Sequence, residues 1–386
     1  MKKSPNLGEG QGNDLDSFAF IIHPIDAKRD VGRKYPLLGR FLSVKQIDFF
    51  STYFPPVYIS QIDGLRSTGT GKEVKGWFVA CPLTPRRMLE LPERTVYRKI
   101  VETGRLAERL GARILGLGAF TSVVGDAGVT IASQLSIPVT TGDSYTVAVA
   151  IEAARAGAQA MGIPLAAATV AVVGATGAVG AVAAELMARD VAKLWLIGRR
   201  VDSLEALRER IMSLTTAQVE IATDMAPLAG VDVLLTVTSA LDTVIEPEHL
   251  RPGAVVCDVA RPRDVSARVA AARDDVLVID GGMVQAPGTD VQFNFDFGFP
   301  AGLVYACMAE TMALALEGRF ESFTLGRNIN VAQVQEIAAI AHKHGFRLAG
   351  FRSFERALTP ADVERVAARA ASARRQAAHA VPGAGR

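Results

Sequence analysis

Three kinds of residue in this 386-residue chain could act together chemically: a glycine-rich turn, a pair of arginines and a cysteine. Gly174, Gly177 and Gly180 recur at three-residue spacing in VAVVGATGAVG, between a β-branched run and an expected helix. Such a turn lets the backbone approach a pyrophosphate and points helix N–H groups at it. An ordinary tight turn is the alternative, but the strand–turn–helix context favours a dinucleotide. The other residues expected to contact the nucleotide are Ala175, Thr176, Ala178, Val179 and Thr238.

The next expected strand ends in LWLIGRR and places Arg199 and Arg200 at the adenosine side of the turn. A site for NAD usually has an acidic residue there to bind the ribose 2′-hydroxyl group. Guanidinium groups suit a 2′-phosphate instead. We therefore predict NADP(H) as the cofactor, with two solvated surface arginines as the alternative.

Cys307 is a candidate nucleophile within AGLVYACMAETMALAL. On its environment alone, a small buried hydrophobic residue is the more common role for such a cysteine. The run predicts a helix from about Pro300 to Glu317, which leaves little helix-dipole activation at the thiol. Cys81 and Cys257 are far away in the sequence, so we expect neither a disulfide framework nor a metal site.

These residues need elements that position them, and the alternation of strands and helices predicts an α/β protein. We expect a Rossmann-type doubly wound parallel sheet, an N-terminal α/β substrate domain, and C-terminal helices that pack back on it. The predicted units are a disordered segment 1–16, a substrate domain 17–163, an NADP(H)-binding domain 164–299, helices 300–346 that carry the cysteine, and a partly disordered extension 347–386. Within them we expect a strand at Thr169–Val173, a helix at Val331–His344 and disorder after about Ala370.

The composition narrows the classes of function. A net charge of +2 and 6% aromatic residues give no support for nucleic-acid binding. No signal peptide and no transmembrane segment are expected. We expect a cytoplasmic protein, and peripheral contact with a membrane stays open. A basic cluster could receive an acidic carrier protein or be a solvated helix face; it comprises Arg86, Arg87, Arg94, Arg98 and Lys99.

Several segments together resemble the cyanobacterial long-chain acyl-[acyl-carrier-protein] reductases, which form fatty aldehydes with NADPH. They are LGAFTSVV, TTGDSYT, VAVVGATGAVG, LWLIGRR, YACMAE, LGRNI and AHKHGF, in order from about residue 18 to 346. The resemblance implies that Cys307 accepts the acyl group as a thioester, which hydride from NADPH then reduces. It also implies acyl carrier protein or acyl-CoA as the donor, and an enzyme that consumes the aldehyde as a further partner.

Residues after the first-domain strands are candidates to stabilise the oxyanion of that reaction, since carboxyl ends of strands face the interdomain crevice. They are Thr121, Ser122, Thr141 and Ser144, for which ordinary loop and N-cap roles are equally compatible. Tyr145 stands where the resemblance leads us to expect a histidine. His344 is a candidate acid–base group, although a histidine interacting with a helix dipole is the simpler interpretation.

The chain departs from the family pattern in VARPRD and in FNFDFGFPAGL, so acyl-chain length and carrier preference stay open. Two other functions also stay open. One is a shikimate/quinate-type NADP-dependent dehydrogenase, although that family's substrate-domain lysine motif is not found in this sequence. The other is a non-catalytic NADP-binding protein in which Cys307 is structural.

Overall fold

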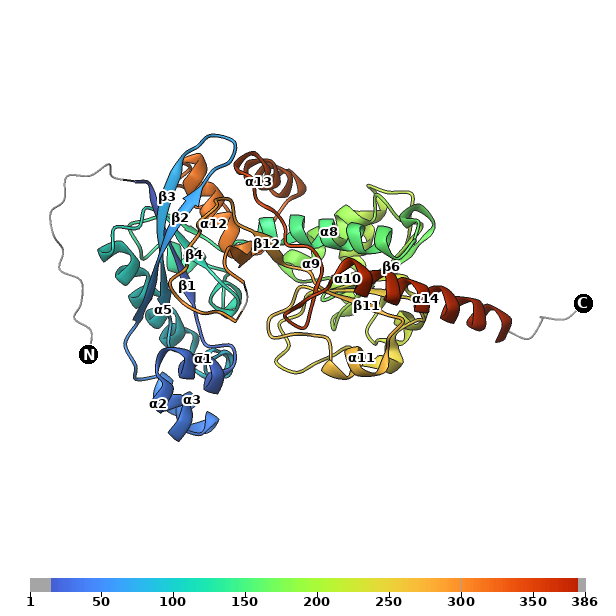
Figure 1. Ribbon diagram of the computed structural model, residues 1–386, viewed down its shortest axis with the longest axis horizontal. Coiled ribbons are helices and arrows are strands. Elements are labelled where there is room, and N and C mark those ends of the chain that lie inside the picture. Colours follow the sequence, from blue (N-terminus) through green and yellow to red (C-terminus); the bar gives the residue numbers. More distant parts are fainter. Residues whose placement is uncertain (1–14, 299, 381–386) are drawn as a thin grey trace, which may run out of the picture.

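Two main β-sheets lie along the long axis of the molecule in the computed structural model, which describes residues 15–298 and 300–380 (Figure 1). The first has five strands in the order β2-β3-β1-β4-β5, and the second has six in the order β11-β10-β9-β6-β7-β8. The predicted mixed α/β architecture with a doubly wound parallel sheet is confirmed.

The first sheet is parallel except at its β2 edge, where β2 runs antiparallel to β3. Its strands alternate between two cores: Phe18 and Phe20 face α12, whereas Ala19 and Ile21 face α5. This two-residue period is what a sheet covered on both faces requires. The elements are β1 (Ser17–Ile22), β2 (Val57–Arg66), β3 (Glu73–Ala80), α4 (Pro85–Glu90), α5 (Glu93–Arg109), β4 (Leu115–Leu117), α6 (Phe120–Val123), α7 (Val129–Ala132) and β5 (Val139–Thr140).

Three short helices between β1 and β2 form a lobe at one end of the molecule (Figure 1). They are α1 (Ala27–Lys34), α2 (Pro36–Phe41) and α3 (Val44–Ser51). Asp26 caps α1 and Ser43 caps α3, while α2 has Pro36 in its first turn. These caps satisfy the free N–H groups that every helix start exposes.

The second sheet is parallel throughout and has the strand order of a dinucleotide-binding domain, with the order reversing between β6 and β9. One face is covered by α8, α9 and α10, and the other by α11 and short 3-10 turns. The elements are η1 (Leu165–Ala167), β6 (Thr169–Val173), α9 (Ala178–Met187), β7 (Lys193–Ile197), α10 (Val201–Met212), β8 (Gln218–Ala222), η2 (Ala226–Gly230), β9 (Val233–Thr236), η3 (Pro247–His249), β10 (Val255–Asp258), α11 (Ala267–Ala272) and β11 (Leu277–Asp280).

One helix, α8 (Asp143–Ala160), belongs to both cores. Val147, Ala150 and Ala154 pack into the core of the second sheet, whereas Tyr145 and Val149 pack into that of the first. The C-terminal helices α12 (Ala306–Glu317) and α13 (Val331–His344) pack on α8 and on the first sheet's core, as predicted.

The segment before α12 corrects one prediction. The helix expected from about Pro300 begins only at Ala306, because Leu303–Tyr305 forms strand β13. This strand pairs with β12 (Met283–Gln285), which also pairs with β14 (Arg347–Leu348). Gly302, with φ +79°, turns the chain into the strand at a conformation that other residues rarely adopt.

The C-terminal extension is also more ordered than predicted. After a short hairpin of β15 (Arg352–Ser353) and β16 (Arg356–Ala357), helix α14 runs from Pro360 to Ala380 and replaces the disorder expected after about Ala370. Arg374 fastens it by donating to the Gly253 carbonyl oxygen at 2.6 Å. The expected disorder at 1–16 falls almost wholly outside the described residues. Within the described residues, no helix combines the length and the hydropathy that crossing a bilayer requires.

Candidate active site

The glycine-rich turn lies at the carboxyl edge of the second sheet, where the strand order reverses. Gly174 has φ +82°, and a Cβ atom there would lie 2.6 Å from the Val237 carbonyl oxygen. A Cβ atom at Gly180 would collide with the Gly174 carbonyl oxygen. Gly177 is the N-cap of α9, so the helix starts where a phosphate would be received. The backbone therefore needs glycine at Gly174 and Gly180, and the turn fits a dinucleotide.

The residues beside the turn are placed as a nucleotide site requires. Arg199 and Arg200 are exposed and directly follow β7, the strand next to β6. Thr238 borders Gly174, but its hydroxyl and backbone N–H both donate to the buried Asp264 carboxylate. Thr238 therefore contributes to the wall of the site, and its hydroxyl group is already hydrogen-bonded to Asp264.

Cys307 is the second residue of α12, half-buried, with Tyr305 as the N-cap. The weak helix-dipole effect expected from a start near Pro300 is therefore wrong, because the thiol lies in the first turn. Backbone N–H groups there lower the pKa of the thiol, but burial and the nearby Asp143 carboxylate outweigh them and raise it to about 12. The thiol is protonated at neutral pH and needs a base to act as a nucleophile.

The turn between β5 and α8 meets the start of α12. Gly142 has φ +78°, and a Cβ atom there would lie 2.5 Å from the Cys307 Cβ atom, so only glycine allows this approach. The next residue, Asp143, begins α8. Burial and the Glu310 carboxylate raise the pKa of Asp143 to about 7. A carboxyl group that titrates near neutral pH beside a thiol is suited to general acid–base work.

Glu310 lies one turn after Cys307 on α12 and is fully buried. It accepts hydrogen bonds from the Thr140 hydroxyl at 2.5 Å and from the Tyr145 N–H at 2.9 Å. Burial raises its pKa, while these donors oppose the rise. Thr140 also accepts from the Thr324 N–H at 3.0 Å. Glu310 therefore ties the β5–α8 turn to the helix that carries the cysteine.

Three of the predicted site residues, among them two of the oxyanion candidates, are placed in different surroundings by the fold. Thr141 is fully buried beside Asp143, and its hydroxyl lowers the pKa of that carboxyl group. Ser122 donates to the Ala119 carbonyl oxygen at 2.7 Å within α6. The Tyr145 ring packs against Phe346 in the core, and burial raises the pKa of its hydroxyl. Of the three, Thr141 lies in the turn that contacts Cys307.

The structure does not bring His344 to the cysteine. His344 ends α13, and its ring nitrogens bond Ser67 at 2.9 Å and the Glu317 carboxylate at 2.7 Å. Glu317 is the last residue of α12, about 15 Å along the helix from Cys307 at 1.5 Å per residue. His344 therefore connects the C-terminal ends of α12 and α13, away from Cys307.

Two carboxylates near the thiol, Asp143 and Glu310, were missed in the sequence. Their signals were present: Asp143 directly follows the glycine that ends TTG, and Glu310 is the acidic residue of an otherwise apolar helix start. A charged residue on an apolar face is unusual enough to mark a buried network. The sequence does not show that these two carboxylates lie close together, because residues 143 and 310 belong to distant segments.

The VARPRD segment, which departs from the family pattern, links the two halves of the site. Arg261 lies 5.3 Å from the centroid of the Tyr305 ring, directly before the helix of Cys307. Its guanidinium group is also 3.5 Å from the Asp280 carboxylate. Asp264 in the same segment holds Thr238 beside the glycine turn. The start of α12 therefore lies at the carboxyl end of the second sheet, where the Ala306 N–H also donates to the Gly282 carbonyl oxygen after β11.

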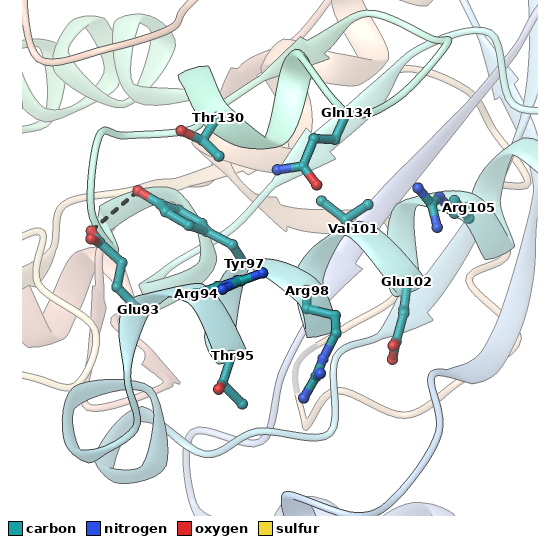
Figure 2. A pocket seen from close by; sticks show the side chains of 10 residues that line it. All are labelled: Glu93, Arg94, Thr95, Tyr97, Arg98, Val101, Glu102, Arg105, Thr130 and Gln134. Atoms are coloured by element: carbon teal, nitrogen blue, oxygen red, sulfur yellow. Dashed lines mark hydrogen bonds between the residues drawn. The ribbon is translucent and has the colours of Figure 1, made fainter.

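A separate hollow of about 780 Å³ lies on α5 and around α7 (Figure 2). It is lined mainly by charged and polar side chains: Glu93, Arg94, Thr95, Tyr97, Arg98, Val101, Glu102, Arg105, Thr130 and Gln134. It shares no residue with the glycine turn or the surroundings of Cys307. Across residues 15–298 and 300–380, no group of His, Cys, Asp and Glu side chains could hold a metal ion.

Comparisons with known proteins agree with a nucleotide-binding domain. Residues 156–280 match the family model described as shikimate / quinate 5-dehydrogenase. The chain is 32% identical over 284 residues to the aminotransferase PigE of Serratia sp., covering 72% of this chain but only 33% of PigE. It is 27% identical to the long-chain acyl-[acyl-carrier-protein] reductase of Synechococcus elongatus, over 86% of this chain and 98% of that protein.

Among solved structures, the NAD-dependent malic enzyme of Thermotoga maritima is 13% identical, with a TM-score of 0.39 over 93% of this chain and 83% of the other. The chain spans about a third of the length of PigE, so PigE does not define its activity. The matched family model and the reductase relative identify a nicotinamide-nucleotide-binding, oxidoreductase-type protein.

Proposed function

We propose that the protein reduces a long-chain fatty acyl thioester to a fatty aldehyde with NADPH, through an acyl-enzyme on Cys307. The observation that carries this proposal is the close approach of Gly142 and the adjoining Asp143 to Cys307, at the start of a helix that lies at the carboxyl end of the second sheet. The relative from Synechococcus elongatus, which aligns over nearly its whole length, supports the acyl thioester as the substrate class.

The residues present fit a dinucleotide. The turn at Gly174–Gly180 would hold the pyrophosphate, and Arg199 with Arg200 would hold the 2′-phosphate of NADPH, which favours NADP over NAD. When bound, the nicotinamide supplies the hydride that reduces the acyl group.

Acylation begins with proton transfer from the thiol. Asp143 accepts the Sγ proton as the bond from Sγ to the acyl carbon forms. The bond between that carbon and the carrier sulfur then breaks, and the carrier leaves as a thiol with the proton from Asp143. The N–H groups of the first turn of α12 are donors for the oxyanion.

Release of the aldehyde uses the same groups. After reduction, the bond from Sγ to the substrate carbon breaks and the carbonyl group forms. Sγ then recovers its proton from Asp143, which solvent has reprotonated. The net change consumes one acyl thioester, one hydride and one proton, and yields an aldehyde and a free carrier thiol.

The hollow on α5 is a suitable site for the donor. Arg94, Arg98 and Arg105 line it, and an acidic acyl carrier protein would be attracted to these cations. Two members of the basic cluster are already engaged: Arg87 bonds Glu90 and Thr52, and Lys99 donates to the Phe54 carbonyl oxygen. We propose that the carrier protein docks at this hollow. The released aldehyde then passes to an enzyme that consumes it.

The match of residues 156–280 favours a second candidate, a dehydrogenase of the shikimate/quinate type. That match covers the nucleotide-binding segment. The first sheet, Asp143 and Cys307 lie outside the matched residues, so this candidate function gives them no role. A single experiment separates the candidates. The protein is incubated with a long-chain acyl thioester without NADPH, and its intact mass is measured.

We expect one acyl adduct on the wild type and on Cys81→Ala, and none on Cys307→Ala. Cys81 is the matched control because it is buried and its thiol pKa is raised to about 11. Absence of an adduct with both carrier-protein and CoA thioesters would exclude the covalent route. NADP+-dependent oxidation of a hydroxylated ring acid, or NADPH-dependent reduction of the corresponding keto acid, would support the second candidate.

A further inference from the structure

The lobe of α2 and α3 exposes far more apolar surface than the rest of the molecule. Eight of the sixteen large apolar side chains that are exposed among the described residues lie within residues 35–54. We call this set the α2–α3 surface; it comprises Tyr35, Leu37, Phe41, Val44, Phe49, Phe50, Tyr53 and Phe54. Phe41 is 73% exposed and Tyr53 71%. Contiguous apolar surface of this kind marks an interaction site.

The folding of the lobe accounts for its inner face only. Gly39 of α2 packs directly against Gly32 of α1, and Ile47, Asp48 and Ser51 form the buried side of α3. Asp48 accepts a hydrogen bond from Thr84 at 2.7 Å, which fastens α3 to α4. The buried side of the lobe therefore contains no residue of the α2–α3 surface. Rings of this surface contact one another edge-on or tilted, with the Phe49 centroid 5.3 Å from that of Phe50 and 5.6 Å from that of Tyr53.

The charge around the rings selects a partner. Within residues 35–54, all of which the structure describes, Arg40 and Lys45 are exposed, whereas Asp48, the acidic residue of that segment, is buried. Arg40 lies over the Phe41 ring at 5.7 Å. The neighbouring α4 adds exposed Leu89 and Arg86, and the charge of its exposed Glu90 is paired with Arg87 at 2.8 Å. Aromatic rings and cations side by side match the anionic interface of a bilayer.

The position of the lobe agrees with this partner. Helices α2 and α3 form a tip on the side of the first sheet, away from the second sheet and from α14 (Figure 1). A projecting tip can enter a flat lipid surface without blocking the nucleotide turn. We propose that the α2–α3 surface docks the protein on bilayers that contain anionic phospholipids, with Leu37, Phe41 and Tyr53 inserted at the headgroup level. This inference does not depend on the proposed reaction.

Vesicle sedimentation tests the proposal on the full chain, without cofactor or acyl substrate. Wild-type protein should sediment with vesicles of phosphatidylcholine and phosphatidylglycerol, and bind pure phosphatidylcholine several-fold more weakly. Leu37→Ser with Phe41→Ser should weaken binding to mixed vesicles at least about tenfold, since each side chain loses apolar burial. Arg40→Glu with Lys45→Glu should weaken binding to mixed vesicles about tenfold and leave binding to phosphatidylcholine unchanged.

The matched control is Met212→Ser with Leu214→Ser, two residues that are each 51% exposed at the end of α10. It should bind as the wild type does, and circular dichroism checks the folding of every variant. The proposal is overturned if the wild type binds neither vesicle or if the control loses binding equally. It is also overturned if the serine variant of Leu37 and Phe41 binds vesicles normally but converts a dimer to a monomer in sedimentation velocity, which would make this surface a contact between two copies.

Discussion

The starts of α9 and α12 both lie at the carboxyl end of the second sheet, but they are built in different ways. The turn before α9 is made by seven consecutive residues, Gly174–Gly180, whose shape depends on their own backbone and on one neighbouring carbonyl group. The start of α12 depends on distant segments: Gly142 packs on Cys307, Thr140 bonds Glu310, and Arg261 lies over Tyr305. A local site can be recognised in the sequence, whereas an assembled site becomes visible only in the fold.

The largest effect should come from breaking the local site. Gly180→Val places side-chain atoms against the Gly174 carbonyl oxygen and should lower NADPH affinity by about a hundredfold or more, measured by fluorescence titration. Acylation of Cys307 without cofactor should persist, because the other site is built separately. Gly230→Ala is the control, since nothing lies within 4 Å of a Cβ atom there. Loss of both activities together would show that the two sites are one structural unit.

In the assembled site, Asp143→Asn should slow the acylation of Cys307 at pH 7 and speed its alkylation at alkaline pH. Without its base, the rate of Cys307 acylation at pH 7 should fall about a hundredfold. The wild-type rate should rise as the pH passes through about 7 and Asp143 ionises, and the variant should lose this rise. Alkylation by iodoacetamide at alkaline pH should instead become faster, because removal of the Asp143 charge lowers the pKa of the thiol.

The control for Asp143 is Glu152→Gln, an exposed carboxylate on the same helix, which should change neither rate. Equal losses in acylation and in alkylation would mean that Asp143 merely maintains the structure. Stopped-flow release of the carrier thiol and mass spectrometry of the alkylated protein provide the two measurements.

A smaller effect is expected at the adenosine side of the local site. Arg199→Ala with Arg200→Ala should weaken NADPH binding about tenfold and leave NADH binding nearly unchanged, as measured by calorimetry. The expected reason is loss of the pairing with the 2′-phosphate. Arg210→Ala, another exposed arginine on the following helix, is the control. A parallel loss for both nucleotides would contradict the assignment to the 2′-phosphate.

The smallest effect on chemistry should be that of His344→Gln. The rate of Cys307 acylation should stay within about twofold of the wild type, since this residue bonds Glu317 and Ser67 at the far end of α12. The free energy of unfolding should fall by about 1–2 kcal/mol, because two buried hydrogen bonds are disturbed. A large loss of acylation would place His344 in the reaction after all.

The same substitution predicts a change with pH. Burial is the main cause that lowers the pKa of His344, although Glu317 opposes it. A neutral histidine is therefore favoured by the fold, and the stability that it contributes is lost as the pH falls below the ordinary histidine value. Chemical denaturation of the wild type should show this loss in acid. His344→Gln should show a smaller loss, since the buried His23, whose pKa burial lowers to about 4, still contributes.

The sequence predicted what is local and periodic. The strand at Thr169–Val173 and the helix at Val331–His344 were predicted at their observed bounds. The glycine turn was recognised because its three glycines lie within seven residues. Apolar alternation and helical spacing depend only on neighbours in the chain, so they survive without knowledge of the tertiary structure.

The errors came from elements that tertiary contacts define. Strand β13 has three residues, and an apolar run of that length before a helix resembles a continuation of the helix. The disorder expected after Ala370 rested on composition, whereas Arg374 anchors α14 to Gly253 across the fold. Asp143 and Glu310 were missed because their importance arises from each other and from Cys307.

The dual membership of α8 has a mechanical consequence. Two-domain enzymes often close over a substrate by rotating one domain against the other. Here α8, a helix of 18 residues, packs into both cores, and its first residue is Asp143. Any such rotation would have to break the packing of α8 in one of the two cores. Asp143 is therefore held in a fixed place relative to both sheets, and the approach of Gly142 to Cys307 does not depend on a closing motion.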